Sequence, residues 1–120
     1  MREYLVISTS VDLVRVASED IVYVSSDGNY SSFVFSYGEP RVVTMQLGQV
    51  ERLLSEQLRG AGGDFIRIGK SLIVNRNYIN YINVPRQQLV VGDGRGRTHG
   101  LTASKEALRQ LKGLIEREMR

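Results

Sequence analysis

Apolar residues in this 120-residue chain recur mostly in short runs with the two-residue period of a β-strand. Short polar turns separate the runs. The clearest is Asp27-Gly28-Asn29, because glycine and asparagine both tolerate a positive φ. Strands joined by such short turns pair in antiparallel fashion. Strands are predicted near residues 3–8, 13–16, 21–24, 30–37, 41–45, 65–68, 72–74, 78–84, 88–91 and 97–101.

The period changes to that of an amphipathic helix in two places. Four apolar residues at i, i+3, i+7 and i+11 from Leu47 predict a first helix, and Gly60 is expected to be its left-handed cap. Ser104 is a suitable N-cap for a second helix near the C-terminus. The predicted fold class is therefore mainly β, with about ten short antiparallel strands in small sheets and two short-to-medium α-helices.

Length and composition narrow the class of protein. A chain of 120 residues predicts one domain over residues 1–120. The chain has no cysteine, so it has no disulfide framework and no thiolate zinc site. No apolar run approaches the roughly 18 residues of a membrane-spanning helix, and the first residues do not resemble a signal peptide. We therefore expect a soluble, intracellular protein that does not contact a membrane.

Positive charge is concentrated in one segment. Residues 1–64 hold five Arg or Lys against nine Asp or Glu, whereas residues 65–105 hold seven against Asp93 alone. A basic segment in an otherwise acidic chain indicates an anionic partner. Thirteen of the sixteen cations are arginine, which suits bidentate contacts to phosphate and guanine. The alternative is a solvated surface on which charge is unevenly distributed by chance.

Motifs for catalysis, cofactors and metals are weak. Gly69-Lys70-Ser71 resembles the end of a P-loop, but Asp64 occupies the position of the first glycine, and a strand pattern follows instead of a helix. His99 is the only histidine, so a metal cluster would need carboxylates that the basic segment lacks. We find no spacing typical of a triad or a catalytic carboxylate pair. The sequence therefore predicts a protein that is not an enzyme and has no cofactor or metal.

The basic segment indicates nucleic-acid binding instead. The final helix is a poor recognition helix, because its exposed positions mix acidic and basic residues and a duplex repels the acidic ones. Loops held on strands can also read DNA, and Lys70 with Ser71 could reach base edges. Six cations without acidic neighbours are candidate phosphate contacts: Arg67, Lys70, Arg76, Arg95, Arg97 and Lys105.

Four ordered motifs resemble the LytTR family, a bacterial DNA-binding domain found mainly at the C-terminus of response regulators. The first runs from Ile21 to Tyr30 and ends in the family's Asp-Gly-Asn-Tyr turn. The second is the helical segment from Met45 to Leu58. The third, Phe65 to Asn75, matches Phe-x-Arg-x-His-Arg/Lys-Ser-x-x-Val-Asn in all but one place, and the fourth is Ala103 to Leu108. The resemblance spans about residues 8 to 116.

The resemblance implies an elongated, mostly β fold that binds double-stranded DNA through loops entering successive major grooves. It also implies a cytoplasmic transcriptional regulator of a bacterial two-component system, with a homodimer on repeated half-sites and a receiver domain or sensor kinase upstream. By position, the contact loops are Asn29-Tyr30-Ser31, Gly69-Lys70-Ser71 and Ser104-Lys105. Two residues depart from the family pattern. Gly69 replaces the usual histidine, and Lys105 replaces an arginine and so loses its bidentate fork.

The predicted DNA-contacting set joins the family loops to the basic segment: Asn29, Tyr30, Ser31, Arg67, Lys70, Ser71, Arg76, Arg97, Ser104 and Lys105. Arg67 also fits a structural partner within its strand, and Asn75 is expected to hydrogen-bond at a strand end rather than read DNA. Two other functions remain open. One is an OB-like module for single-stranded nucleic acid, with the aromatic residues of 23–37 as a stacking platform. The other is a protein-interaction module that does not bind DNA.

Overall fold

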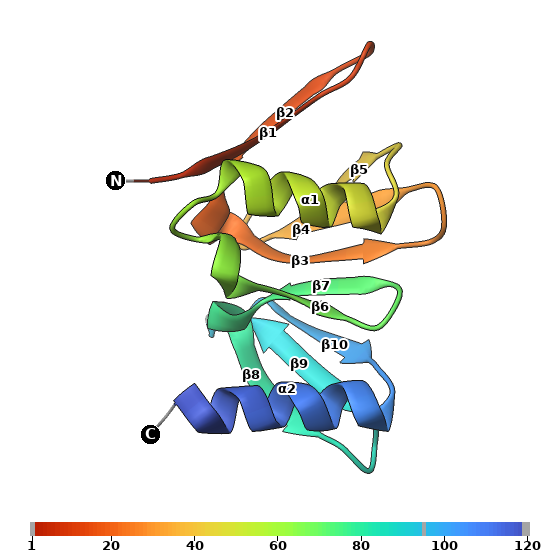
Figure 1. Ribbon diagram of the computed structural model, residues 1–120, viewed down its shortest axis with the longest axis vertical. Coiled ribbons are helices and arrows are strands. Elements are labelled where there is room, and N and C mark those ends of the chain that lie inside the picture. The colour runs from red at the N-terminus through yellow and green to blue at the C-terminus, as the bar shows by residue number, and fades with distance from the viewer. Residues whose placement is uncertain (1, 95, 119–120) are drawn as a thin grey trace.

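The protein is built from three small antiparallel sheets and two α-helices, as a computed structural model shows for residues 2–94 and 96–118 (Figure 1). The molecule measures 43 × 33 × 28 Å. The ten strands and two helices of the described residues confirm the predicted fold class. The helices are α1 (Leu47–Gln57) and α2 (Lys105–Glu118). The strands are β1 (Tyr4–Ser8), β2 (Leu13–Ala17), β3 (Ile21–Ser26), β4 (Ser31–Phe35), β5 (Arg41–Val43), β6 (Phe65–Ile68), β7 (Leu72–Asn75), β8 (Ile79–Asn83), β9 (Gln88–Gly92) and β10 (Thr98–Thr102).

The largest sheet holds five strands in the order β5-β4-β3-β7-β6. Strands β3 and β4 form the hairpin predicted around Gly28, and β6 and β7 form a second hairpin around Gly69. The two hairpins join through β3 and β7, where Ser25 pairs with Leu72. Strand β3 runs toward its hairpin tip and its antiparallel neighbour β7 runs away from its own tip. Both tips therefore lie at the same edge of the sheet (Figure 1).

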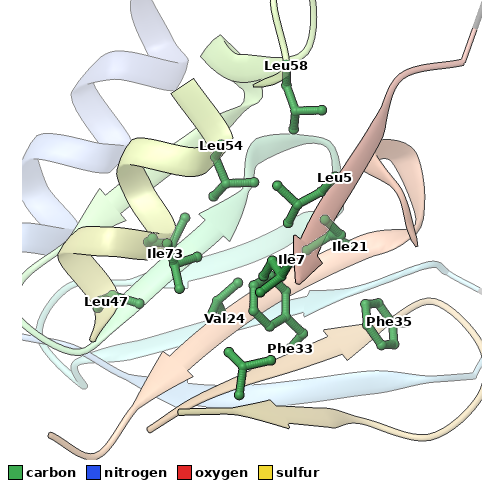
Figure 2. Close-up of a cluster of buried hydrophobic side chains, with 12 residues drawn as sticks. Leu5, Ile7, Ile21, Val24, Phe33, Phe35, Leu47, Leu54, Leu58 and Ile73 are labelled. Carbon is green, nitrogen blue, oxygen red and sulfur yellow. The ribbon is translucent and has the colours of Figure 1, made fainter. Parts of the chain in front are cut away.

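Helix α1 covers one face of this sheet and closes the first of two cores (Figure 2). The predicted apolar stripe from Leu47 to Leu58 is buried there, because one side of the helix faces the sheet. Each large side chain buried in this way contributes about 1.5–3 kcal/mol. The buried members of this core are Leu5, Ile7, Ile21, Val24, Phe33, Phe35, Val43, Leu47, Val50, Leu54, Leu58 and Ile73.

A second core lies on the opposite side of β3 and β7, beneath the three-stranded sheet β10-β9-β8 and α2. Ile73 belongs to the first core, whereas its neighbours Leu72 and Val74 belong to the second. In the same way β3 supplies Val24 to the first core and Val22 to the second. Successive side chains of a strand point to opposite faces, so these paired strands are buried on both sides. They form the rigid centre from which the two hairpin tips project.

The hairpin of β1 and β2 is attached to the body by side chains rather than by a shared sheet. Oε1 of Gln57 accepts a hydrogen bond from the N–H of Val6, and Nε2 of Gln57 donates one to the carbonyl of Val6, both at 2.8 Å. The Glu3 carboxylate accepts the N–H groups of Gly60 at 3.0 Å and Ala61 at 2.7 Å. Gly60 is not among the glycines with a positive φ, so the prediction of a left-handed cap there is wrong. The peptide after α1 is held by Glu3 instead.

We expect Glu3→Gln to lower stability at neutral pH and to have little effect in acid. The N–H groups of Gly60 and Ala61 hold the pKa of the Glu3 carboxyl below its ordinary value of 4.5. A carboxylate with a lowered pKa stabilises the folded state above pH 4.5, and this contribution is lost as the pH falls through the folded-state pKa. Urea unfolding of both proteins at about pH 7 and about pH 3 measures the effect. An equal difference at both pH values would contradict it, and Glu56→Gln on the exposed side of α1 is the matched control.

Candidate nucleic-acid interface

Segments far apart in the sequence meet at one edge of the molecule, on the right-hand side of Figure 1. Two direct contacts join them. The N–H of Ser26 donates to the carbonyl of Ser71 at 2.9 Å, and Nε2 of Gln46 donates to Oδ1 of Asn29 at 3.4 Å. The turns of the two hairpins and the start of α1 therefore share this surface, and Figure 1 shows the start of α2 on the same side of the molecule. We call it the loop edge and define it by residues 27–30, 46–48, 69–71 and 104–105.

The turn between β3 and β4 exposes an amide and an aromatic ring. Gly28 has a φ of +88°, which glycine adopts at little cost, and the N–H of Asp27 donates to the carbonyl of Tyr30 at 3.1 Å. Asn29 is exposed, and Tyr30 keeps 52% of its surface in solvent. The structure thus places Asn29 and Tyr30, both predicted contact residues, on the outer surface of the loop edge.

The loop between β6 and β7 presents a cation and a hydroxyl. Gly69 has a φ of +65°, and Lys70 and Ser71 after it are exposed. Within residues 2–94 and 96–118, no carboxylate forms an ion pair with Lys70. The strand that follows is buried, so the loop is held by a rigid support while its charged side chain stays available.

Arg67 lies beside this loop and is engaged by the protein itself. Its guanidinium donates to the carbonyls of Gly69 at 3.2 Å and Lys70 at 3.4 Å. It also pairs with the Glu51 carboxylate of α1 at 3.0 Å. Of the two interpretations that the sequence left open, these contacts favour the structural partner.

An open hollow of about 580 Å³ lies between the hairpin tips and the start of α1. The residues around it include the cations Arg67 and Lys70 and no carboxylate. The Lys70 ammonium, which no carboxylate of the described residues pairs, suits the phosphates and base edges of nucleic acid. The hollow is lined by Ser26, Gly28, Gln46, Leu47, Gly48, Arg67, Lys70 and Ser71.

The start of α2 forms the lower part of the loop edge (Figure 1). Oγ of Ser104 accepts the N–H of Ala107 at 3.1 Å, which confirms the predicted N-cap. Lys105 is exposed as the first residue of the helix. A hollow of about 230 Å³ is lined by both Gly69 and Ala107, so this helix start is adjacent to the loop of Lys70.

Two residues near the loop edge are not singled out by sequence reasoning. Gln46 caps α1, and its amide contacts Asn29. Arg86 is exposed in the turn between β8 and β9, which hydrogen bonds between Gln87 and Ala103 hold beside the start of α2. Arg86 is one of the seven cations of the basic segment, so the sequence does contain a signal that points to it. Gln46 carries no signal in the sequence, because its position follows only from the packing of α1.

Ser31 does not lie on the loop edge, which corrects its assignment to the contact loop. Its side chain is fully buried, and its hydroxyl donates to the carbonyl of Met45 at 2.7 Å. This hydrogen bond satisfies the hydroxyl inside the first core, so the side chain cannot reach a ligand.

The structure also separates two predicted arginine contacts from the loop edge. Arg76 follows β7 at the opposite edge of the sheet, where it pairs with Glu118. Arg97 precedes β10 at that same opposite edge and donates to the carbonyl of Gly38 at 3.0 Å. Arg95, the other arginine of that turn, lies outside the described residues.

The aromatic residues of β3 and β4 do not form a stacking platform. Phe33 and Phe35 are buried against each other, with ring centroids 6.4 Å apart. The exposed rings of Tyr30 and Tyr37 lie at opposite ends of β4. Bases of a single strand need successive exposed rings, so this arrangement does not favour an OB-like module.

His99 packs edge-on against Tyr23, with ring centroids 5.3 Å apart, and burial raises the pKa of Tyr23. No group of three or more His, Cys, Asp or Glu is placed to hold a metal ion within residues 2–94 and 96–118. Over the same residues, neither helix has the length and apolar character needed to cross a bilayer.

Comparison with known proteins finds a matching family model and similar solved structures. Residues 12–116 match the family model of the LytTr DNA-binding domain. Among solved structures, the chain is similar to the LytTr DNA-binding domain of a protein from Bacillus cereus described as a methyl-accepting/DNA response regulator. The TM-score is 0.64 and the identity 17%, over 96% of this chain and 98% of that one. No curated protein matches the chain.

Proposed function

Because the chain belongs to the LytTR family of DNA-binding domains, we propose that it reads specific sites in double-stranded DNA through the loop edge and regulates transcription. The observation that carries this proposal is the exposed pair Lys70 and Ser71, which lie directly before β7, a strand whose four residues are all buried. The buried strand holds the backbone of this loop in place, so little backbone conformational entropy is lost when the loop binds.

The chemistry of the loop edge supports both parts of DNA recognition. Lys70 and Lys105 are exposed cations that suit phosphate oxygens. The Asn29 amide offers a donor and an acceptor, the pair that reads adenine in the major groove, and the Lys70 ammonium suits the acceptors of guanine. Tyr30 adds an exposed ring for sugar or thymine methyl contacts.

The same proposal extends to the biological setting. The domain acts in the cytoplasm of a bacterium, downstream of a receiver domain or sensor kinase in a two-component system. It binds repeated half-sites as a homodimer, so that two loop edges engage one stretch of duplex. The family membership supports this setting, and the loop edge supplies the DNA-contacting surface.

Selection from a pool of random duplexes tests the proposal. We expect a defined duplex to be enriched and to resist competition by single strands of the same sequence. Its affinity should fall linearly with salt on logarithmic axes, with a slope of about −0.9 for each phosphate contact, because condensed counterions are released. Fluorescence anisotropy at several salt concentrations measures the slope. Enrichment of no duplex would overturn the proposal and favour a protein-interaction module.

A further inference from the structure

The Arg67 side chain makes two contacts with the loop that carries Lys70 and one contact with α1. The Arg67 guanidinium donates through Nε to the Gly69 carbonyl at 3.2 Å and through Nη2 to the Lys70 carbonyl at 3.4 Å. Through Nη1 it donates to Oε1 of Glu51 at 3.0 Å. The planar guanidinium therefore holds the two backbone carbonyls that flank the Cα of Lys70, one from Gly69 and one from Lys70 itself.

The Arg67 guanidinium lies close to the first turn of α1, which gives the Glu51 carboxylate an electrostatic role. Nη1 of Arg67 lies 3.9 Å from the place of a Cβ on Gly48, in the first turn of α1. The N-terminal end of a helix carries a partial positive charge that repels a cation. The Glu51 carboxylate, one turn further along α1, offsets this repulsion and keeps Arg67 turned toward its own loop.

We propose that Arg67 and Glu51 form a positioning pair that fixes the DNA-reading loop, and that Arg67 is not itself a phosphate contact. This inference rests on the proposed function, since it assigns how the loop edge is held ready for duplex DNA. Three donors of Arg67 are already used within the protein, and its charge is neutralised by a carboxylate. Lys70 is left as the cation that meets DNA.

The sign of the effect of Glu51→Gln on affinity tests the pair. If Arg67 were a phosphate contact restrained by Glu51, removing the acidic group would tighten binding, because it frees one cation and removes one repulsive charge. If the pair positions the loop, binding should weaken about three- to tenfold despite the gain in net positive charge. Fluorescence anisotropy with the duplex enriched in the selection measures the change. Glu56→Gln, on the same helix and also exposed, controls for the change in net charge.

Two further measurements separate positioning from a general loss of structure. Arg67→Lys keeps the charge but cannot make three bonds from one planar group, so it should weaken binding as Glu51→Gln does. In a Lys70→Ala background, Glu51→Gln should have little further effect, because both changes act through the same side chain. Circular dichroism and thermal unfolding establish that each variant is folded.

The outcomes distinguish this inference from the proposed function. If the wild-type chain enriches no duplex, the proposed function fails. If the wild-type chain binds but Glu51→Gln leaves affinity unchanged or raises it, the positioning pair is overturned and DNA binding stands. Retention of full affinity by Arg67→Lys would also overturn it, since a simple point charge would then be sufficient.

Discussion

Replacing Lys70 with alanine is expected to weaken binding to the selected duplex about 5- to 150-fold, equivalent to about 1–3 kcal/mol. The lysine stands at the tip of a rigid hairpin, and no carboxylate of the described residues is paired with it. Its full charge is therefore available to the partner. The loss is at the upper end of the range if the ammonium reads a guanine, and at the lower end if it contacts only phosphate.

The salt dependence of the variant identifies which contact Lys70 makes. A lost phosphate contact lowers affinity about equally for all duplexes and reduces the salt slope by about one. A lost base contact instead relaxes specificity at one position of the site. Lys112→Ala is the matched control, because Lys112 is exposed on the outer face of α2 and pairs with Glu116. If Lys70→Ala combined with Ser71→Ala leaves duplex affinity unchanged, the loop edge is not the DNA-binding surface.

Replacing Asn75 with leucine is expected to lower the free energy of unfolding by about 2–4 kcal/mol while leaving duplex affinity intact. The Asn75 side chain is 2% exposed. It donates to the Ile21 carbonyl at 2.9 Å and accepts the N–H of Asn77 at 3.0 Å. Leucine has a similar size but removes the partner of both backbone groups, at about 1–3 kcal/mol for the buried Ile21 carbonyl and less for the N–H of the exposed Asn77.

Denaturant unfolding and anisotropy on the same protein samples test this second prediction. Asn80→Leu is the control, since it makes the same chemical change at an exposed position of β8. Asn75 ends β7 at the edge opposite to the loop edge, so it should not affect DNA contacts. Loss of affinity with unchanged stability would show instead that Asn75 reads DNA.

Local chemistry in the sequence was sufficient to predict most of the elements. The turn at Gly28 was predictable because a positive φ is inexpensive there, and the structure has a φ of +88°. The α1 stripe from Leu47 was predictable because helical spacing places its members on one side. The cap at Ser104 was predictable because its hydroxyl can accept an early N–H of the helix.

The burial of Ser31 and the contacts of Arg67 depend on tertiary packing, which local sequence patterns do not reveal. Ser31 is polar and adjoins a turn, yet β4 buries it because the Met45 carbonyl lies close enough to accept its hydroxyl. That contact joins residues 14 positions apart, and it depends on how the chain packs after β5. The contacts of Arg67 with Glu51 depend in the same way on α1 crossing the central sheet.

The sequence alone could have predicted that Arg76 lies at the opposite end of the strand from Lys70. Lys70 and Arg76 flank one predicted strand, and six residues of extended chain span roughly 20 Å. Charges at the two ends of a strand face opposite edges of the sheet, so they cannot both serve one narrow surface. The net charge of the basic segment does not reflect this geometry. Cations at opposite ends of one strand lie on different surfaces, although they are close in sequence.

Strands β3 and β7 are direct neighbours, so the interval between the Tyr30 and Lys70 tips is set by the sheet and not by the turns. Neighbouring strands are held about 4.8 Å apart by their backbone hydrogen bonds, and here both faces are packed as well. Under the proposed function, changes of residue in either turn therefore alter which bases are preferred without altering the distance between the two tips. In protein engineering, the sheet can be kept constant while the residues of the two turns are changed. New target preferences should be sought by exchanging residues in the two turns, with the strands left as they are.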